Sequence, residues 1–256
     1  MLVEDTLFGR VNKVAIAIER LKTFEPPEGY YLAFSGGKDS QCIYHLAEMA
    51  GVKFDAHYNV TTIDHPELIY FIRKNYPTVQ WNRPKIPLLK LIETKGFPTS
   101  ANRWCCDLYK ERGGDGRRVV TGVRKEESRK RSSRKMVEQC FKNKSKTYIN
   151  PIIDWNEDDV WEFIMELSLP YCELYDPPHS FTRLGCIMCP SASLQIRKLH
   201  SIWYPRFVTA YRKSFIKLFN NNHRESMNRW RCGEDMFHWW LFEMTPDNPD
   251  QTVMFE

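Results

Sequence analysis

The segment Ser35-Gly36-Gly37-Lys38-Asp39-Ser40 decides the fold class, because it joins a short apolar run to a helical pattern. The apolar run covers residues 30–34 and is typical of a strand. The helical pattern covers residues 41–49 and is closed by Gly51. Glycines let such a turn bring its backbone N–H groups close to a ligand, and a helix N-terminus attracts anions. The segment therefore predicts an anion-binding loop.

Strand-like and helix-like runs alternate on both sides of this loop. Helices are predicted at residues 7–21, 66–75 and 88–94, and strands at 54–60, 78–81 and 118–123. Asp64 is the predicted N-cap of the helix at 66–75. Alternation of this kind is typical of a parallel sheet. The predicted fold class is therefore α/β, with a twisted parallel sheet, helices on both of its faces and a helical C-terminal region.

The pattern changes after residue 124. Residues 124–146 are rich in Lys and Arg and predict a solvated loop. A helix is predicted at 157–167 with Asn156 as its N-cap, and helices are predicted again from residue 191 onward. We expect a nucleotide-binding α/β domain at residues 1–155. The helical region at 156–256 is expected to carry the second pair of cysteines.

The composition places few limits on function. The 256 residues are 42% hydrophobic and 27% charged, as in a globular protein, and the formal net charge is +5. That charge suits an anionic partner such as a nucleotide or a nucleic acid. The N-terminus lacks a signal-peptide pattern, and no apolar run is long enough to span a bilayer. We therefore expect a cytoplasmic protein without a membrane partner.

The side chains of the loop predict its ligand. Ser35 and Ser40 add hydroxyl donors, and Lys38 is expected to reach the terminal phosphates. Asp39 is expected to hold the accompanying Mg²⁺ or to fix the loop, so Lys38 and Asp39 are the candidate catalytic residues. The spacing matches neither P-loop NTPases nor dinucleotide-binding folds. It resembles the pyrophosphate loop of the N-type ATP pyrophosphatases, which implies ATP as the ligand and release of pyrophosphate.

Four of the eight cysteines form two groups, the adjacent pair Cys105-Cys106 and the C-x-x-C of Cys186 and Cys189. Thiolates are the preferred ligands of iron–sulfur clusters and also bind zinc. An adjacent pair is unusual for zinc, whose cysteine ligands are commonly separated by two to four residues. Zinc and free buried thiols stay open as alternatives. Three further cysteines are interpreted as buried or incidental, namely Cys42, Cys140 and Cys172.

The two cysteine groups resemble the [4Fe–4S] pattern of sulfonucleotide reductases in the phosphoadenosine-phosphosulfate (PAPS) reductase family. The resemblance covers about residues 28–191 and implies an adenine nucleotide alpha hydrolase-like fold. It is supported by residues 62–67, by 121–124 with Glu127, Ser128 and Arg131, and by 150–155, 159–161 and 170–171. It implies a cluster held by Cys105, Cys106, Cys186 and Cys189. It also implies nucleotide contacts from Thr62, Asp64, Gly122, Arg124 and Arg131.

The resemblance leaves the reaction open. A reductase would attack a sulfonucleotide with a cysteine in a C-terminal Glu-Cys-Gly-x-His segment, but this chain has Arg231-Cys232-Gly233-Glu234. Reductases of this family also tend to lose the complete loop pattern, which is intact here. The favoured hypothesis is therefore an ATP pyrophosphatase that adenylates an acceptor and supports sulfur transfer with the cluster.

The expected partners follow from this hypothesis. They are ATP, a sulfur donor and an acceptor, which can be DNA or tRNA, as in the iron–sulfur sulfurtransferases that the chain resembles. A third hypothesis is a non-enzymatic module that binds nucleotide or nucleic acid through the basic and aromatic stretches at 124–146 and 197–231. The acceptor and the oligomeric state are not predicted.

Overall fold

The computed structural model describes residues 2–6, 9–221 and 229–243, which form two compact units. The first unit comprises Met1–Asn59, Pro66–Asn82 and Gly113–Leu184. The second comprises Val60–His65, Arg83–Arg112 and Gly185–Glu256. The units therefore do not divide at residue 155, where the sequence led us to expect a domain boundary. Residues 156–184 belong to the first unit, and two segments from the N-terminal half belong to the second.

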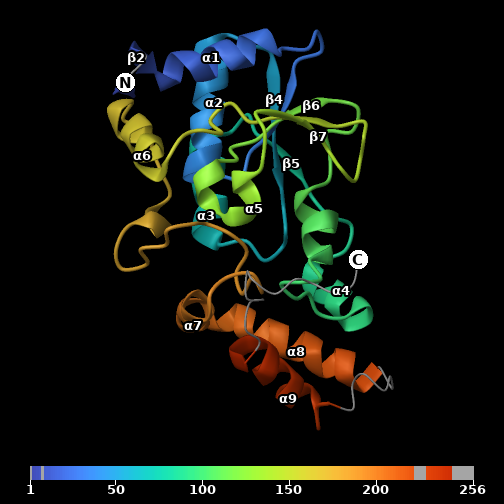
Figure 1. Cartoon of the computed structure of the whole chain (residues 1–256). Helices are drawn as coiled ribbons and strands as arrows, with labels where there is room; N and C mark the ends of the chain where they lie inside the picture. Colours follow the sequence, from blue (N-terminus) through green and yellow to red (C-terminus); the bar gives the residue numbers. More distant parts are fainter. Residues whose placement is uncertain (1, 7–8, 222–228, 244–256) are drawn as a thin grey trace. The chain divides into compact units, whose positions relative to one another are not determined.

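The first unit contains a six-stranded sheet in the order β5-β4-β3-β6-β8-β7 (Figure 1). Every pair of neighbours is parallel except β7 and β8 at one edge, which confirms the predicted α/β class. The central strand β3 pairs with β4 and β6, so that Tyr31 lies opposite both Asp55 and Val119. The strands are β3 (Tyr30–Ala33), β4 (Phe54–Asn59), β5 (Gln80–Asn82), β6 (Arg118–Val120), β7 (Val137–Gln139) and β8 (Thr147–Ile149).

Helices flank this sheet, and α2 packs against α1 and α6 (Figure 1). The helix α6 begins as predicted, because the Asn156 side chain accepts a hydrogen bond from the backbone N–H of Asp159 in a capping box. The helix α2 ends at Gly51, which has φ +67°. The helices of this unit are α1 (Lys13–Thr23), α2 (Lys38–Ala50), α3 (Pro66–Asn75), α5 (Arg129–Ser132) and α6 (Glu157–Glu166), with 3-10 turns η2 (Lys125–Glu127) and η3 (Glu173–Tyr175).

Three local predictions are wrong. The helix predicted from residue 7 begins only at Lys13, because β1 (Val3–Thr6) and β2 (Gly9–Asn12) pair as an antiparallel hairpin before it; residues 7 and 8 lie outside the described chain. The predicted loop 124–146 contains η2, α5 and β7, since β7 gains its hydrogen bonds from β8. Asp64 does not cap α3, because its carboxylate accepts hydrogen bonds from the backbone N–H and hydroxyl of Thr61.

The second unit is helical, which confirms the prediction for the described residues after 191. The helix α8 packs against α4, α7 and α9 around a core that includes Tyr211, Phe215 and Trp240. The Tyr211 and Trp240 rings stack with their centroids 5.3 Å apart. The elements are α4 (Leu88–Lys95), the π-helical turn η1 (Cys106–Lys110), α7 (Leu194–Trp203), α8 (Pro205–Asn221), α9 (Gly233–His238) and the π-helical turn η5 (Trp239–Glu243).

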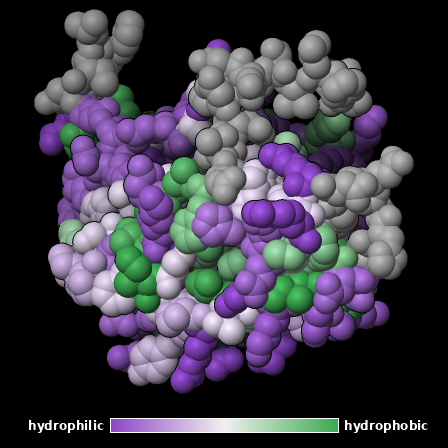
Figure 2. Space-filling model, turned by 90° about the horizontal axis from the view of Figure 1, so that it is seen from below, coloured by the Kyte–Doolittle hydropathy of each residue, from purple (hydrophilic) through white to green (hydrophobic). Residues whose placement is uncertain are grey.

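The surface is largely hydrophilic, and the apolar residues on the face in Figure 2 form small patches between polar ones. Two of the most exposed apolar side chains in the described chain are Phe141 and Ile202. Within the residues that the structure describes, no helix has the length and apolar character needed to cross a membrane.

Candidate functional site: a glycine-rich loop and a four-cysteine cavity

The loop Ser35–Ser40 follows the carboxyl end of β3, a central strand with parallel neighbours on both sides. Gly37 is the N-cap of α2, and Lys38 is the first residue of that helix. In an open parallel sheet, ligands bind beyond the carboxyl ends of the strands. The structure therefore places the predicted anion-binding loop where this fold class binds ligands.

Gly36 fits its position only because it lacks a side chain. Its φ is +75°, in the left-handed region, and an added Cβ would lie 2.7 Å from Ile72 and 2.8 Å from Leu68 on α3. Gly122 is similarly confined, since a Cβ there would lie 2.8 Å from the backbone oxygen of Asp39. Two predicted site glycines are thus explained by close approach around the loop.

Gly36→Ala tests this close approach, with Gly51→Ala as its control. Both glycines have positive φ, but an added Cβ at Gly51 would meet no atom within 4 Å. We expect Gly51→Ala to lower the free energy of unfolding by about 1 kcal/mol, and Gly36→Ala by about 2–4 kcal/mol because steric overlap is added. Urea unfolding of both variants checks this. Equal losses would contradict the packing argument.

The loop holds its own hydroxyl groups in place and leaves backbone donors available. The Ser35 hydroxyl donates to the Ser40 Oγ at 3.1 Å, and the Ser40 hydroxyl donates to the Gly37 carbonyl at 2.8 Å. For the backbone N–H groups of Asp39 and Ser40, the described chain provides no hydrogen-bond acceptor. These groups lie in the first turn of α2, where N–H groups lack intrahelical partners. They are the donors that an anion at this loop would use.

Lys38 is buried, with 3% of its surface exposed. Its Nζ donates to the Thr182 carbonyl at 2.6 Å and lies 3.4 Å from a carboxylate oxygen of Glu157. Its Nζ also lies 5.3 Å from the ring centroid of Tyr175 and 5.9 Å from that of Trp161. A phosphate at the loop would therefore compete with Thr182 for this ammonium group.

Tyr175 is a site residue that the sequence did not reveal. Its hydroxyl accepts a hydrogen bond from the backbone N–H of Lys38 at 3.0 Å. Burial raises the pKa of Tyr175, so it is a neutral phenol near pH 7. Nothing in its surrounding stretch, interpreted as a loop, distinguishes it from other tyrosines. Only the packing of η3 against the loop identifies it.

Asp39 and Arg124 form an ion pair. The Nε of Arg124 lies 2.6 Å from Asp39 Oδ1, and the Nη1 of Arg124 lies 3.0 Å from Glu126. Arg124 is only 3% exposed, so its charge is held by these carboxylates rather than offered to solvent. Arg131, the second arginine predicted to contact phosphate, is paired with Glu127. Both arginines therefore lie in ion pairs of the first unit.

Arg124→Met is expected to destabilise the protein by about 2 kcal/mol, because it leaves a partly buried Asp39 carboxylate without its cation. Arg20→Met is the control. Arg20 forms a bidentate pair with Asp154, whose side chain is 47% exposed, and we expect a loss below about 1 kcal/mol. Denaturant unfolding measures both. A smaller loss for Arg124→Met than for Arg20→Met would contradict the structural role.

Thr62 and Asp64, also predicted to contact nucleotide, belong to the second unit. The Thr62 hydroxyl oxygen accepts a hydrogen bond from the backbone N–H of Leu88 at 3.0 Å. Asp64 forms an isolated antiparallel bridge with Cys186. The structure thus brings the segment containing Thr62 and Asp64 to the cysteine groups, and their predicted nucleotide contacts stay a prediction.

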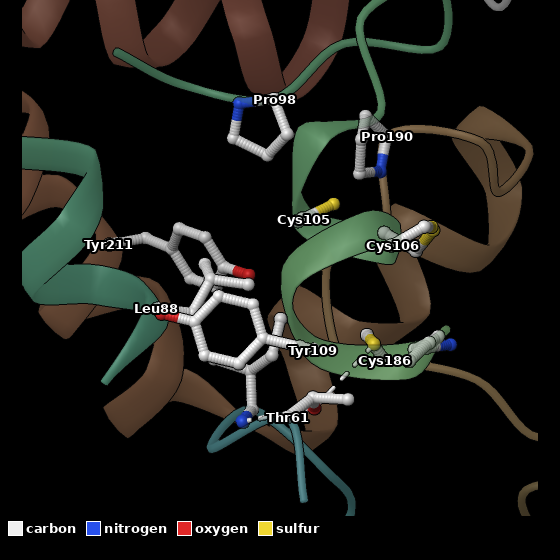
Figure 3. A pocket seen from close by; sticks show the side chains of 12 residues that line it. Thr61, Leu88, Pro98, Cys105, Cys106, Tyr109, Cys186, Pro190 and Tyr211 are labelled. Atoms are coloured by element: carbon white, nitrogen blue, oxygen red, sulfur yellow. Dashed lines mark hydrogen bonds between the residues drawn. The ribbon is translucent and has the colours of Figure 1, made fainter. Parts of the chain in front are cut away.

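All four predicted metal-ligating cysteines line one cavity of the second unit (Figure 3). Cys105 and Cys106 lie at the start of η1, and Cys186 and Cys189 flank a turn before α7. In Figure 3, Tyr109 and Tyr211 face the labelled cysteines across the cavity. The Cys186 thiol lies 3.6 Å from the Thr61 hydroxyl. The fold therefore brings together two cysteine groups that are far apart in sequence.

Cations and thiols interact around this cavity. The Cys105 thiol and the Arg103 guanidinium, 3.2 Å from the Cys106 sulfur, favour the Cys106 thiolate and lower its pKa to about 5. The negative charge of Cys186, when that thiol is ionised, raises the pKa of Lys110, which also lines the cavity. Burial raises the pKa of Cys186 itself. The cavity thus combines soft sulfur donors with positive charge that would balance bound thiolates.

The chemistry of the four thiols matches the donor set of an iron–sulfur group or of zinc, both of which take four thiolates, but the arrangement of the side chains is not that of a metal site. In residues 2–6, 9–221 and 229–243, no three Cys, His, Asp or Glu side chains are gathered closely enough to hold a metal ion. The eight cysteines are free thiols, and Cys42 and Cys172 are buried. Cys232 is exposed at the N-cap of α9, where its sulfur accepts a hydrogen bond from Asp235.

Comparison with known proteins identifies the family of the chain. Residues 29–192 match the family described as "Phosphoadenosine phosphosulfate reductase domain". An uncharacterized protein of Methanocaldococcus jannaschii is 30% identical over 195 residues, which are 71% of this chain and 47% of that protein. An adenosine 5'-phosphosulfate reductase of Oceanobacillus iheyensis is 33% identical over 156 residues, which are 57% of this chain and 61% of that enzyme. The chain thus spans about half the length of these relatives.

A solved structure supports the fold. The phosphoadenylyl-sulfate reductase of Candida auris, a phosphate complex, superposes with a TM-score of 0.52 at 20% identity. The superposition covers 69% of this chain and 88% of that one. At this level of identity the likeness concerns the fold alone.

Proposed function

This chain belongs to the phosphoadenosine phosphosulfate reductase domain family, and on that premise we propose that it binds ATP at the loop Ser35–Ser40 and cleaves it between the α- and β-phosphates. The observation that carries this proposal is the loop itself. All residues of the Ser-Gly-Gly-Lys-Asp-Ser pattern are present, and the tight turn of the loop requires Gly36. The backbone N–H groups of Asp39 and Ser40 have no acceptors in the described chain. A lysine begins the helix that follows.

The choice of ATP over a sulfonucleotide depends on Lys38. A sulfonucleotide has a sulfate with a single negative charge in place of the β- and γ-phosphates, so an ammonium group at the pyrophosphate end of the loop would gain less from it than from the more highly charged pyrophosphate of ATP. In ATP cleavage, an oxygen of the acceptor attacks the α-phosphorus, and the bond from that phosphorus to the bridging oxygen breaks. Lys38 exchanges the Thr182 carbonyl for an oxygen of the departing pyrophosphate, whose charge the loop amides also stabilise.

We further propose that Cys105, Cys106, Cys186 and Cys189 hold a [4Fe–4S] cluster. The support is that all four line one cavity, together with Lys110. Such a cluster would supply sulfur or electrons for a transfer to the adenylated acceptor. The chain's own contribution is to hold the thiolates and balance their charge through Arg103 and Lys110. The net charge of +5 is compatible with a nucleic acid acceptor, DNA or tRNA.

The test uses anaerobically purified protein with ATP and Mg²⁺, alone and with tRNA or DNA as acceptors. The expected products are pyrophosphate and an equal amount of adenylyl group, which is attached to the acceptor or released from it as AMP by hydrolysis, and pyrophosphate is expected to form faster with the true acceptor. Release of ADP and phosphate, or no turnover with any acceptor, would contradict the proposed cleavage.

A second candidate is reduction of adenylyl sulfate to sulfite, which is favoured by relatives named adenosine 5'-phosphosulfate reductase. Its nucleophile would be Cys232, an exposed thiol. The thiolate would attack the sulfur and displace AMP. Incubation with adenylyl sulfate and a thiol reductant decides between the two. Sulfite release that disappears in Cys232→Ser would establish the reductase and overturn the ATP proposal.

A further inference from the structure

The backbone of the turn from Cys186 to Cys189 is held by residues from distant parts of the second unit. The backbone N–H of Ile187 donates to the Ile63 carbonyl at 2.9 Å. The Ile187 carbonyl accepts from the Tyr211 hydroxyl at 3.2 Å. Within the turn, the backbone N–H of Cys189 donates to the Cys186 carbonyl at 3.2 Å. Both backbone groups of Ile187 and the N–H of Cys189 therefore have specific partners.

Met188 has an uncommon backbone conformation within the turn. Its φ is +60°, a left-handed conformation that is uncommon for any residue other than glycine. Its side chain is fully buried, so its backbone N–H needs a protein acceptor. That acceptor is the Nδ1 of His200, at 3.0 Å.

His200 is well placed to keep this role. It lies on α7 with 3% of its surface exposed. Its ring packs edge-on against the rings of His65 and Tyr204, whose centroids lie 5.0 Å and 6.0 Å from its own. Burial lowers the pKa of His200 to about 4, so the ring is neutral near pH 7. Because Nδ1 accepts from Met188, the neutral ring carries its proton on Nε2.

We propose that His200 is a positioning residue that fixes the Cys186–Cys189 turn and thereby directs both thiols into the cavity shared with Cys105 and Cys106. The identity of the group held there rests on the proposed function. The positioning of the turn by His200 is independent of that function, because it follows from the hydrogen bond between the Met188 N–H and the His200 ring.

Two amide variants separate this role from a general effect on stability. His200→Asn places its side-chain oxygen near the position of Nδ1, whereas His200→Gln extends its oxygen toward the position of Nε2. Both are polar and differ by one methylene group. His200→Leu removes the acceptor altogether. Only the asparagine variant is expected to keep the hydrogen bond to Met188.

The primary measurement is alkylation of metal-free, reduced protein with iodoacetamide, followed by peptide mapping. Cys189, which is partly exposed, is expected to react about tenfold faster in the Gln and Leu variants, equivalent to about 1.4 kcal/mol. In the Asn variant its rate should stay within about twofold of the wild type. Cys140 serves as the reference thiol and should react equally in all proteins, and Cys42 should stay protected as long as the fold is intact.

Iron and sulfide content after anaerobic purification is the second measurement. We expect the Asn variant to retain the wild-type content and the Gln variant to lose more than half of it. Unchanged Cys189 reactivity in the Gln and Leu variants, or equal reactivity in Asn and Gln, would overturn the positioning role. If Cys42 becomes reactive in the Leu variant, that variant has lost its fold and is set aside, and the comparison of the Asn and Gln variants still tests the positioning role. A wild type without iron would refute the cluster, while the alkylation series would still test His200.

Discussion

Lys38→Met is expected to lower the rate of ATP cleavage by about 100-fold or more, because it removes the ammonium group that stabilises the leaving pyrophosphate. Lys38 is 3% exposed and bonded to the Thr182 carbonyl, so methionine fills a similar space, and the Glu157 carboxylate that loses its cation has a side chain that is 48% exposed and stays solvated. We therefore expect the fold to survive and ATP to bind with an affinity reduced by about tenfold or less. Single-turnover measurement of pyrophosphate release over a range of ATP concentrations separates the two effects.

Lys74→Met is the control for this variant, since Lys74 is an exposed lysine on α3 of the same unit. Its cleavage rate should match that of the wild type. If Lys38→Met cleaved ATP at the wild-type rate, the contacts of Lys38 would be structural only, and the proposed role in catalysis would be wrong.

Cys186→Ala is expected to reduce the iron content from about four per chain to less than one, because a four-iron cluster needs all four thiolates. Cys172→Ala is the matched control, since Cys172 is also a buried free thiol but does not line the cavity. We expect Cys172→Ala to keep its iron and its brown colour while losing some stability through the cavity that it creates. Metal analysis and visible absorption of anaerobic samples check both variants.

Three results would contradict the cluster. One is stoichiometric zinc in the wild type, which would assign the cavity to a structural zinc site. Another is wild-type iron content in Cys186→Ala. The third is an equal loss of iron in both variants, which would indicate a general effect of removing a buried thiol rather than the loss of a ligand.

The sequence by itself determined the elements around the loop. The strand before Ser35, the helix after Lys38 and the end of that helix at Gly51 are encoded locally, by apolar periodicity and by glycine. The capping box at Asn156 is equally local. Such signals depend on neighbours within a few residues, so they can be recognised without knowing the fold.

The short strands were missed because local sequence does not determine them. Strands β7 and β8 have three residues each, and β7 is stabilised by pairing with β8 rather than by its own pattern. The hairpin before α1 was missed because the spacing of its apolar residues also continues the helical pattern. In both cases the hydrogen-bond partner, which the sequence does not name, decided the conformation.

Only the tertiary structure decided how the site residues are used. Arg124 is paired with Asp39, 85 positions away, and Lys38 donates to Thr182, 144 positions away. The turn that carries Cys186 and Cys189 depends on His200, whose buried ring satisfies the N–H of Met188. The chain has many lysines and arginines, and the sequence does not say which of them pairs with a given acceptor. Burial and distance in the folded chain decide this. The sequence therefore identified the loop and the cysteines, while the fold brought the cysteines to one cavity and gave Arg124 and Lys38 their partners.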